Sequence, residues 1–298
     1  MFIIYNEAIE KAMREDPYIP PPDALTLTAT ADNSSVKLMK NGTVNNTYEV
    51  NTGSGWVPYT FGTVINLNKG QSCKWRCTSH PTSFSSKTYV QFVMTGSIEA
   101  SGEVYSMLSS NLSDVTTLNG YNFAFVGLFR GCTSLTQVPQ LSATTLADGC
   151  YLFMFEGCTS LTQAPQLPAK TLAGSCYYFM FEGCTSLTQA PSLPATTLAS
   201  YCYSYMFKGC TSLTRAPKLP ATTLASSCYG SMFYNCSNLK EVRIAAIKKA
   251  TGALDNWLSG ASATGDFYCD PNATIFPTDS ISGIPEGWTR HNIADYPN

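Results

Sequence analysis

Hydrophobic and polar residues alternate across positions 24–103 as they do in half-buried β-strands. In LTLTATA, leucine and alanine would face a core while threonine faces solvent. CKWRC likewise places Cys73, Trp75 and Cys77 on one face of a strand. Short alternating segments separated by Gly and Asn turns predict a small immunoglobulin-like β-sandwich in residues 24–103.

From residue 104 to residue 244 the pattern becomes a repeat of 26 residues. One unit reads LPATTLASYCYSYMFKGCTSLTRAPK, at 193–218, and imperfect units occupy 116–129 and 233–244. Atypical end units are expected where a stack must be capped. Two series of cysteines mark the period, namely Cys132, Cys158, Cys184, Cys210 and Cys236, and Cys150, Cys176, Cys202 and Cys228.

The spacing inside one unit predicts a short helix. Leu198, Cys202 and Met206 are four residues apart, so a helix would place them on one face, and Gly209 would end it. A proline recurs as Pro139, Pro165, Pro191 and Pro217. It is expected at a strand end, because a mid-strand proline removes a ladder hydrogen bond. Each unit therefore reads as strand, turn and helix, stacked at about 4.8 Å per rung. The predicted fold class is mixed β plus α/β solenoid.

The two ends of the chain differ from the repeats. Residues 1–23 contain little core material and end in PYIPPP, which predicts a docking arm. Its apolar contact residues would be Phe2, Ile3, Ile4, Tyr5, Ile9 and Met13. Residues 245–298, with ALDNWLSG and IPEGWT, are predicted to form a C-terminal cap. No apolar run approaches the roughly 20 residues of a membrane span, and no signal-peptide pattern is seen, so we expect neither membrane insertion nor secretion by a signal.

Charge is sparse along the chain. Only 13% of residues are charged, about half the usual share, and the net charge is −2. The chain has no excess of basic residues, so we expect no nucleic-acid partner. The surface must instead be built largely from Ser, Thr, Asn, Gln, Gly and Tyr.

The repeated cysteines are best explained as small, buried, reduced side chains. Cys150 and Cys158 would be roughly 12 Å apart on a helix, too far for a disulfide. Equivalent cysteines on neighbouring rungs point in parallel, and a line of ligands without histidine does not make a tetrahedral zinc site. Catalysis needs one special cysteine beside a base, not nine copies. We expect no metal and no cofactor.

Other catalytic patterns are missing. The two histidines, His80 and His291, lie in unrelated regions, and no zinc-protease, hydrolase or nucleotide-binding motif occurs. DFYCDPNAT, at 266–274, is oxygen-rich but lacks the Gly and Glu of a calcium loop, so an ordinary turn is expected. The chain is predicted not to be an enzyme.

Function is then expected at the surface positions where the units differ. In a stack such positions line up as stripes, including Gln137, Gln163, Gln189 and Arg215, and Gln140, Gln166, Ser192 and Lys218. An aromatic stripe of Phe153, Tyr178, Phe179 and Tyr205, together with Arg215 and Lys218, is the candidate ligand surface. The alternative is that the aromatic stripe only packs neighbouring helices together.

The motif FxGCTSLTxxPxLPATTLAxxCYxxMF resembles the leucine-rich repeats of BspA-like proteins, found in Bacteroidales bacteria and in the phages that infect them. The resemblance covers about residues 25–298, including VMTGSIEASGEVYSML, NWLSGASATGDF and SGIPEGWT. It implies a leucine-rich-repeat stack that functions in surfaces, adhesion or virions rather than in catalysis.

Two functions are therefore expected. The first is a structural and binding component of a phage virion, such as a head fibre, decoration or tail-associated protein. Its arm would dock on other virion proteins, and its repeats would bind a host surface protein or glycan. We also expect a homo-oligomer at the virion surface. The alternative is a bacterial cell-surface BspA-like adhesin.

Overall fold

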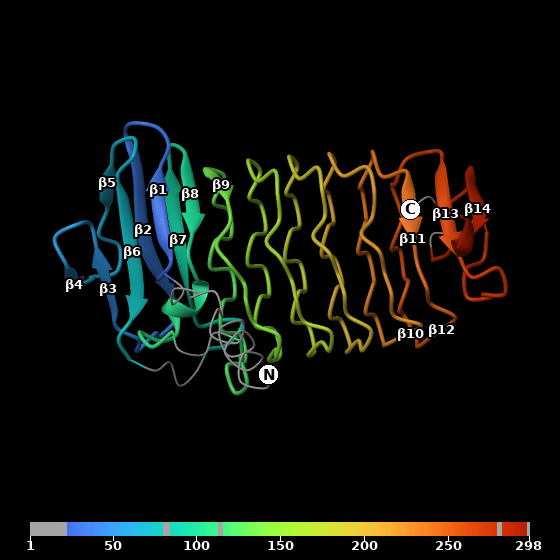
Figure 1. Cartoon of the computed structure of the whole chain (residues 1–298), viewed down its shortest axis with the longest axis horizontal. Coiled ribbons are helices and arrows are strands. Elements are labelled where there is room, and N and C mark those ends of the chain that lie inside the picture. Colours follow the sequence, from blue (N-terminus) through green and yellow to red (C-terminus); the bar gives the residue numbers. More distant parts are fainter. Residues whose placement is uncertain (1–22, 80–83, 113–115, 279–281, 297–298) are drawn as a thin grey trace, which may run out of the picture.

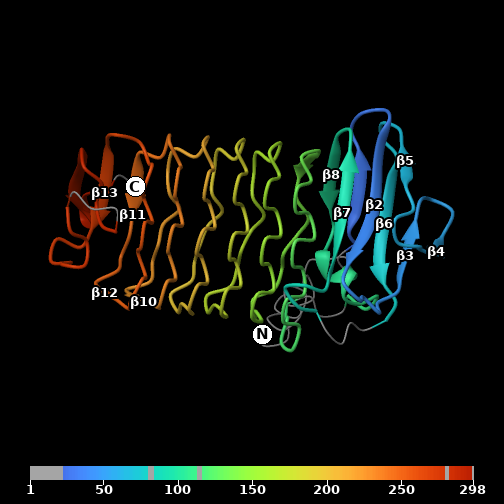
Figure 2. The same cartoon turned by 180° about the vertical axis from the view of Figure 1, so that it is seen from behind.

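The computed structural model describes residues 23–79, 84–112, 116–278 and 282–296. The molecule is elongated: two sheets stand at its N-terminal end, thin rungs stack along its length, and a small sheet closes the far end (Figure 1). The view from behind shows the same order of parts (Figure 2). Among the described residues, no helix reaches the length and apolarity that a membrane span requires.

Nine strands build the two N-terminal sheets. They are β1 (Thr26–Ala29), β2 (Ser34–Asn41), β3 (Tyr48–Asn51), β4 (Trp56–Pro58), β5 (Ile65–Leu67), β6 (Ser72–Cys77), β7 (Tyr89–Thr95), β8 (Ile98–Ser101) and β9 (Leu135–Gln137). One sheet has the order β4-β3-β6-β1-β8-β9 and the other β5-β2-β7. Trp75 and Phe92, both fully buried, meet edge to face at 5.1 Å between ring centroids, so the sheets share one core.

The larger sheet continues into the repeats. β9 belongs to the first repeat unit and pairs in parallel with β8, placing Leu135 opposite Ile98. Nearby, the buried Glu103 forms backbone bridges with Ala24 and Gln140 and precedes the 3-10 helix η1 (Val104–Met107). The repeats therefore extend the larger sheet directly, through the pairing of β9 with β8.

A parallel sheet closes the C-terminal end. The elements are β10 (Thr223–Leu224), β11 (Glu241–Arg243), β12 (Lys248–Lys249), β13 (Gly265–Cys269), β14 (Trp288–Asn292) and the 3-10 helix η2 (Ile293–Asp295). β10 pairs with β12, and the closing sheet has the order β11-β13-β14. The buried Trp257 contacts Phe267 and Phe276 and seals this end of the core.

The α/β solenoid expected from the sequence is wrong. The described residues contain strands, turns and the two 3-10 helices but no α-helix, so the molecule is nearly all β. The predicted helix of each unit, around Cys202 and Met206, is a chain of consecutive turns. Gly209, expected to stop a helix, is one more left-handed position in that chain, with φ 71°.

Those turns form a second kind of ladder. Every second amide donates to the next unit, as from Tyr151 to Cys176 (3.0 Å) and from Phe155 to Met180 (2.9 Å). The amides between them donate three residues back, as from Met154 to Tyr151 (3.2 Å). Each backbone amide of the turn ladder therefore has a hydrogen-bond acceptor. This is required when a segment without helix or sheet is buried.

A left-handed residue every fourth position produces this geometry. Gly149, Phe153 and Gly157 have φ of 60°, 57° and 72°. The period of four also brings Cys202 and Met206 into the core, as a helix would have done. A spacing of four residues thus fits both a helix and the turn ladder. The helix prediction failed because the spacing of side chains does not show whether the backbone amides bond within a rung or to the next rung.

We number the rungs 1 to 5 as residues 123–148, 149–174, 175–200, 201–226 and 227–251. Buried rings at equivalent positions stack through all of them. The phenylalanine column comprises Phe129, Phe155, Phe181, Phe207 and Phe233, with centroids 5.5 to 5.7 Å apart. The tyrosine column comprises Tyr151, Tyr177, Tyr203 and Tyr229, with centroids 5.6 to 5.8 Å apart. Because equivalent atoms are one repeat apart, these distances are the rung spacing in the core.

The remaining parts of rungs 1 to 4 pair only alternately, whereas rung 5 pairs both with rung 4 and, through β11, with β13. Rung 1 pairs with β8, rung 2 with rung 3 through bridges at Gln163–Gln189 and Thr171–Thr197, and rung 4 with rung 5. Within the fully described ranges 135–147, 161–173, 187–199 and 213–225, no backbone hydrogen bond joins rung 1 to rung 2 or rung 3 to rung 4. We call these two gaps open seam 1/2 and open seam 3/4.

The spacing of the columns explains the open seams. A β ladder needs strands about 4.8 Å apart, whereas the core sets 5.5 to 5.8 Å. Between rungs 1 and 4, two rungs that draw together to pair move away from their other neighbours; rung 5 pairs on both sides because the ring columns end there. Alternate pairing preserves the stacked ring columns and still forms backbone hydrogen bonds across every second seam between these rungs.

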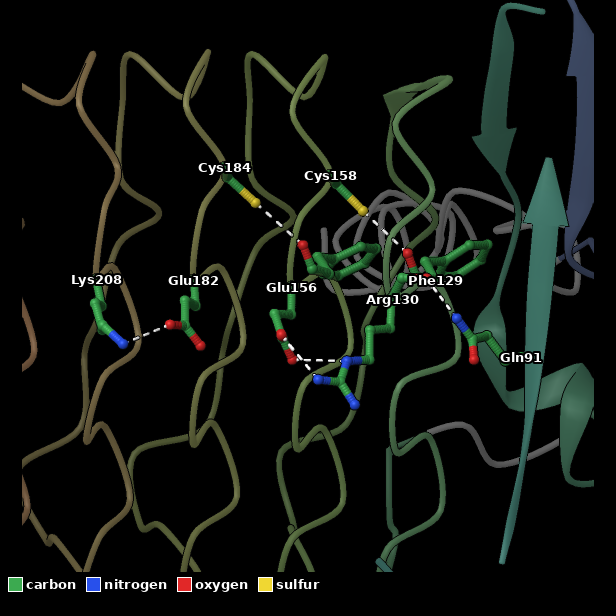
Figure 3. A network of polar contacts seen from close by, with 9 residues as sticks. Gln91, Phe129, Arg130, Glu156, Cys158, Glu182, Cys184 and Lys208 are labelled. Carbon is green, nitrogen blue, oxygen red and sulfur yellow. Dashed lines mark hydrogen bonds and ion pairs between the residues drawn. The ribbon is translucent and has the colours of Figure 1, made fainter. Parts of the chain in front are cut away.

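All twelve cysteines are buried, as expected for the repeated cysteines as packing residues, and none is bonded to another. Cys158 and Cys184 each donate from Sγ to a carbonyl oxygen of the previous rung, those of Phe129 and Phe155, both at 3.1 Å (Figure 3). The thiols therefore add a weak hydrogen bond between rungs to their packing.

Amide hydrogen exchange should distinguish open from paired seams. The amides of Leu118 and Leu172 donate across paired seams to Thr145 (2.8 Å) and Thr197 (3.0 Å). The equivalent Leu146 and Leu198 face open seams. We expect Leu146 and Leu198 to exchange up to about tenfold faster, the worth of one hydrogen bond. Equal protection of all four amides, measured by NMR, would contradict alternate pairing.

The fold should lose stability in mild alkali. Burial raises the pKa of the Cys132, Cys150 and Cys184 thiols to about 12, whereas an unfolded thiol titrates near pH 8.5. Only the unfolded chain then releases these protons, so stability is full below about pH 8.5 and falls as pH rises toward 12, by up to about 1.4 kcal/mol per pH unit for each thiol.

Urea unfolding under reducing conditions at pH values from neutral to mildly alkaline measures this slope. The variant Cys150→Ala with Cys184→Ala provides the control, because it removes two of the titrating thiols and should have a shallower slope. A wild-type unfolding free energy independent of pH would show that the thiols are not buried.

Candidate functional site

A cluster of rings, which we call the aromatic ridge, lies on the turn side of rungs 2 to 4. It consists of Phe153, Tyr178, Phe179, Tyr201 and Tyr205. Phe179 stacks between Phe153 at 5.2 Å and Tyr205 at 4.4 Å. All three stacked residues have left-handed φ near 57°, so their backbone is held by the turn ladder rather than by preference.

Tyr178 stands against the edge of this stack. Its ring is nearly perpendicular to Phe179, at 85° and 4.4 Å, and both faces of Phe179 are already occupied. Tyr178 also contacts Tyr201 at 6.3 Å, and Tyr201 is the most exposed ring of the ridge at 47%. Partial burial raises the pKa of Tyr178, with smaller contributions from Tyr205, Tyr201 and Glu182, so its hydroxyl remains a donor at neutral pH.

A row of charges runs beside the ridge. Arg130 pairs with Glu156 at 2.9 Å, and Lys208 pairs with Glu182 at 2.8 Å (Figure 3). The cations also reach the rings: Arg130 lies 5.0 Å from the Phe153 centroid, and Lys208 lies 5.6 Å from that of Tyr205. The hydrogen bond from Lys208 to Glu182 raises the lysine pKa, which keeps the cation charged.

This arrangement limits what the ridge can bind. Arg130 and Phe179 cover the two faces of Phe153, and Phe179 is covered by its own neighbours, so neither ring can stack on a flat ligand. The ridge instead offers ring edges, tyrosine hydroxyls and neutralised ion pairs. Among the described residues, no group of three acidic, histidine or cysteine side chains could hold a metal ion.

The structure brings together only part of the predicted ligand surface. Phe153, Tyr178, Phe179 and Tyr205 form one cluster. Arg215 and Lys218 are exposed on a different segment of rung 4, where Arg215 lies 3.5 Å from Glu241. The arm residues Phe2, Ile3, Ile4, Tyr5, Ile9 and Met13 lie outside the described residues.

The charged row was missed by the sequence interpretation, although a signal for it exists. Arg130, Glu156, Glu182 and Lys208 occupy the one variable position in FRGC, FEGC, FEGC and FKGC. Reading that position across units would have predicted a cation at each end and acids between. Its place beside the rings could not be read, because it follows from the turn ladder.

A second surface lies over open seam 1/2. Three grooves there have volumes of about 410, 560 and 430 Å³. Each is lined by residues of both rung 1 and rung 2, among them Gln137 and Gln163 in the first groove, Pro139 and Pro165 in the second, and Leu146 and Leu172 in the third. The sequence did not predict these grooves.

In the segment 266–274, residues 266–269 belong to β13, and the expected turn follows the strand at residues 270–274. The Asn272 amide donates to Asp270 at 2.7 Å, closing the turn with a side chain. Asp266 pairs instead with His291 at 2.7 Å, across the strands β13 and β14. His80 lies outside the described residues.

Comparison with known proteins finds no match among protein families, curated proteins or solved structures. The resemblance of the repeat motif to BspA-like proteins therefore stays a prediction. Function has to be argued from the two surfaces of the repeats.

The left-handed backbone at Phe179 makes a sharp prediction. Phe179→Ala and Phe179→Gly both remove the ring, but only glycine adopts φ near 56° without strain. We expect the glycine variant to be more stable than the alanine variant by about 1 kcal/mol in urea unfolding, the reverse of the usual order.

Tyr177 provides the matched control. Tyr177 stacks in the tyrosine column but has no left-handed φ. Tyr177→Ala should therefore be more stable than Tyr177→Gly. If Phe179→Ala were as stable as Phe179→Gly, the left-handed conformation would be wrong.

Proposed function

We propose that this chain is a non-enzymatic structural and binding protein of a phage virion, such as a head fibre, decoration or tail-associated protein. Its stack of rungs would display a side-chain surface that attaches to a host surface protein or glycan.

The observation that carries the proposal is where the units differ. Buried positions are almost uniform: the inner cysteines and the phenylalanine column hardly change from rung to rung. Some exposed positions vary, as in the series Gln140, Gln166, Ser192 and Lys218, and the series Gln137, Gln163 and Gln189 changes to Arg215. A repeated interior with a varied exterior is the design of a scaffold that presents contacts.

The construction of the stack supports a role as a stiff spacer. The turn ladder hydrogen-bonds every rung to the next, and the phenylalanine column joins Phe92 of the N-terminal sheets to Phe233. Trp257 then contacts Phe233 and continues the core into the closing sheet. An elongated body with one continuous core holds its ends at a fixed separation.

The row of charges beside the ridge supports binding rather than catalysis. Glu156 and Glu182 are each neutralised by a cation at under 3 Å, so neither is poised as a free acid or base. The motif's resemblance to BspA-like repeats, associated with surfaces, adhesion and virions, supports the same class. Docking through residues 1–23 is proposed from the sequence alone.

Purified particles test the proposal. We expect the full-length chain to copurify with particles and to be detected on them by labelled antibodies, while a chain lacking residues 1–20 is lost from particles but folds normally by circular dichroism. The deletion removes the apolar residues of the proposed arm, Phe2, Ile3, Ile4, Tyr5, Ile9 and Met13.

Two results would count against it. Unchanged incorporation of the deleted chain would remove the arm from the proposal. Antibody labelling of intact bacterial cells, with none on particles, would favour the cell-surface adhesin instead.

A further inference from the structure

We propose that open seam 1/2 is a binding site for a neutral oligosaccharide. The inference rests on the proposed function of the stack as an attachment surface, and it names the place and the chemistry of the ligand. The aromatic ridge is a separate surface, whose stacked ring faces are largely closed to a sugar.

The three grooves over this seam form one trough. The first and second grooves share Val138 and Ala164, and the second and third share Thr144 and Pro168. The trough therefore follows rungs 1 and 2 from Glu99 at one end to Ala173 at the other. A site of this shape suits a chain-like ligand rather than a compact one.

Four glutamines form the rim of the trough. They are Gln137, Gln140, Gln163 and Gln166, all exposed. The Gln137 amide already donates to Glu99 at 3.2 Å, which orients it. At the equivalent positions rung 3 carries Gln189 and Ser192, and rung 4 carries Arg215 and Lys218, so among these four rungs only rungs 1 and 2 have glutamine at both positions. Amides both donate and accept, which matches sugar hydroxyl groups.

The open backbone of the seam selects the same chemistry. Across paired seams the Leu118 and Leu172 amides bond directly to the next rung, but the Leu146 amide and the Thr171 carbonyl do not meet. If paired rungs approach to about 4.8 Å, the rungs of an open seam stand roughly 6 Å apart. A hydroxyl group can accept from one rung and donate to the other, whereas a carboxylate only accepts and an ammonium only donates.

The floor of the trough is apolar and nearly free of charge. Val138 and Ala164, both half-buried, provide methyl groups against which the C–H face of a pyranose can pack, and the buried Pro139 and Pro165 line the same grooves. Glu99 and Lys170, at opposite ends, are the charged residues among those that line it. This balance favours a neutral sugar over an acidic or phosphorylated one.

The test uses the full chain and a panel of neutral oligosaccharides cut from dextran, mannan and cellulose. Binding is measured by calorimetry, and its place by amide exchange. We expect at least one member of the panel to bind and to protect the Leu146 amide, while the equivalent Leu198 amide at open seam 3/4 is unchanged.

Three single variants locate the site. Gln163→Leu and Gln166→Leu should each weaken binding about tenfold, the loss of one good hydrogen bond. Gln189→Leu is the matched control, because Gln189 sits in the same local sequence, LTQAP, but lines none of the three grooves. Its affinity should stay that of the wild-type chain, and circular dichroism checks that all three variants fold.

The outcomes separate this inference from the proposed function. If no oligosaccharide of the panel binds while the chain is still found on particles, the seam proposal is overturned and the virion role stands. Equal weakening by Gln189→Leu, or protection of Leu146 by unstructured peptides alone, also overturns it. If the chain is missing from particles and yet the seam binds sugar as described, the virion role fails and the site stands.

Discussion

The stacking of equivalent aromatic rings sets the spacing on which the rest of the structure depends. The phenylalanine and tyrosine columns repeat every 5.5 to 5.8 Å, wider than the roughly 4.8 Å of a hydrogen-bonded ladder. The turn segments tolerate this spacing because half of their amides bond within the rung. The strand-like segments have no such freedom, so they pair two by two and leave seams between the pairs.

The turn ladder shows how a chain can bury backbone without helix or sheet. It needs a left-handed residue every fourth position, and several of these are not glycine: Phe153, Phe179 and Tyr205 among them. Each costs about 1 kcal/mol of backbone strain or more. Their rings offset that cost by stacking on the outside of the stack, which ties the aromatic ridge to the geometry of the backbone beneath it.

Features that follow from a single repeat unit were predicted from the sequence. Features that depend on how two neighbouring units bond and pack were not. The period of 26 residues, the buried thiols of Cys158 and Cys184, and the clustering of Phe153 with Phe179 all follow from copying one unit. The helix was mispredicted because Leu198, Cys202 and Met206 fit either conformation. Whether an amide bonds inside its rung or to the next is not encoded in side-chain spacing.

The same distinction applies to the candidate sites. Arg215 and Lys218 were grouped with the rings because all lie at variable positions, yet they stand on another segment of the rung. The ion pairs of Glu156 and Glu182 could have been read from FEGC and its variants. The trough at open seam 1/2 could not, since it arises from competition between ring spacing and ladder spacing, which no single unit displays.

Alternate pairing also gives the stack a parity. Rung 1 is committed to β8 and rung 4 to rung 5, so the rungs between them must be even in number for all to find partners. Rungs 2 and 3 satisfy this condition. One extra 26-residue unit would shift which rungs pair at the C-terminal end, where rung 5 already pairs with β13 as well as with rung 4. The number of repeats and the pairing of the rungs are thus linked, although the sequence repeats one unit at a time.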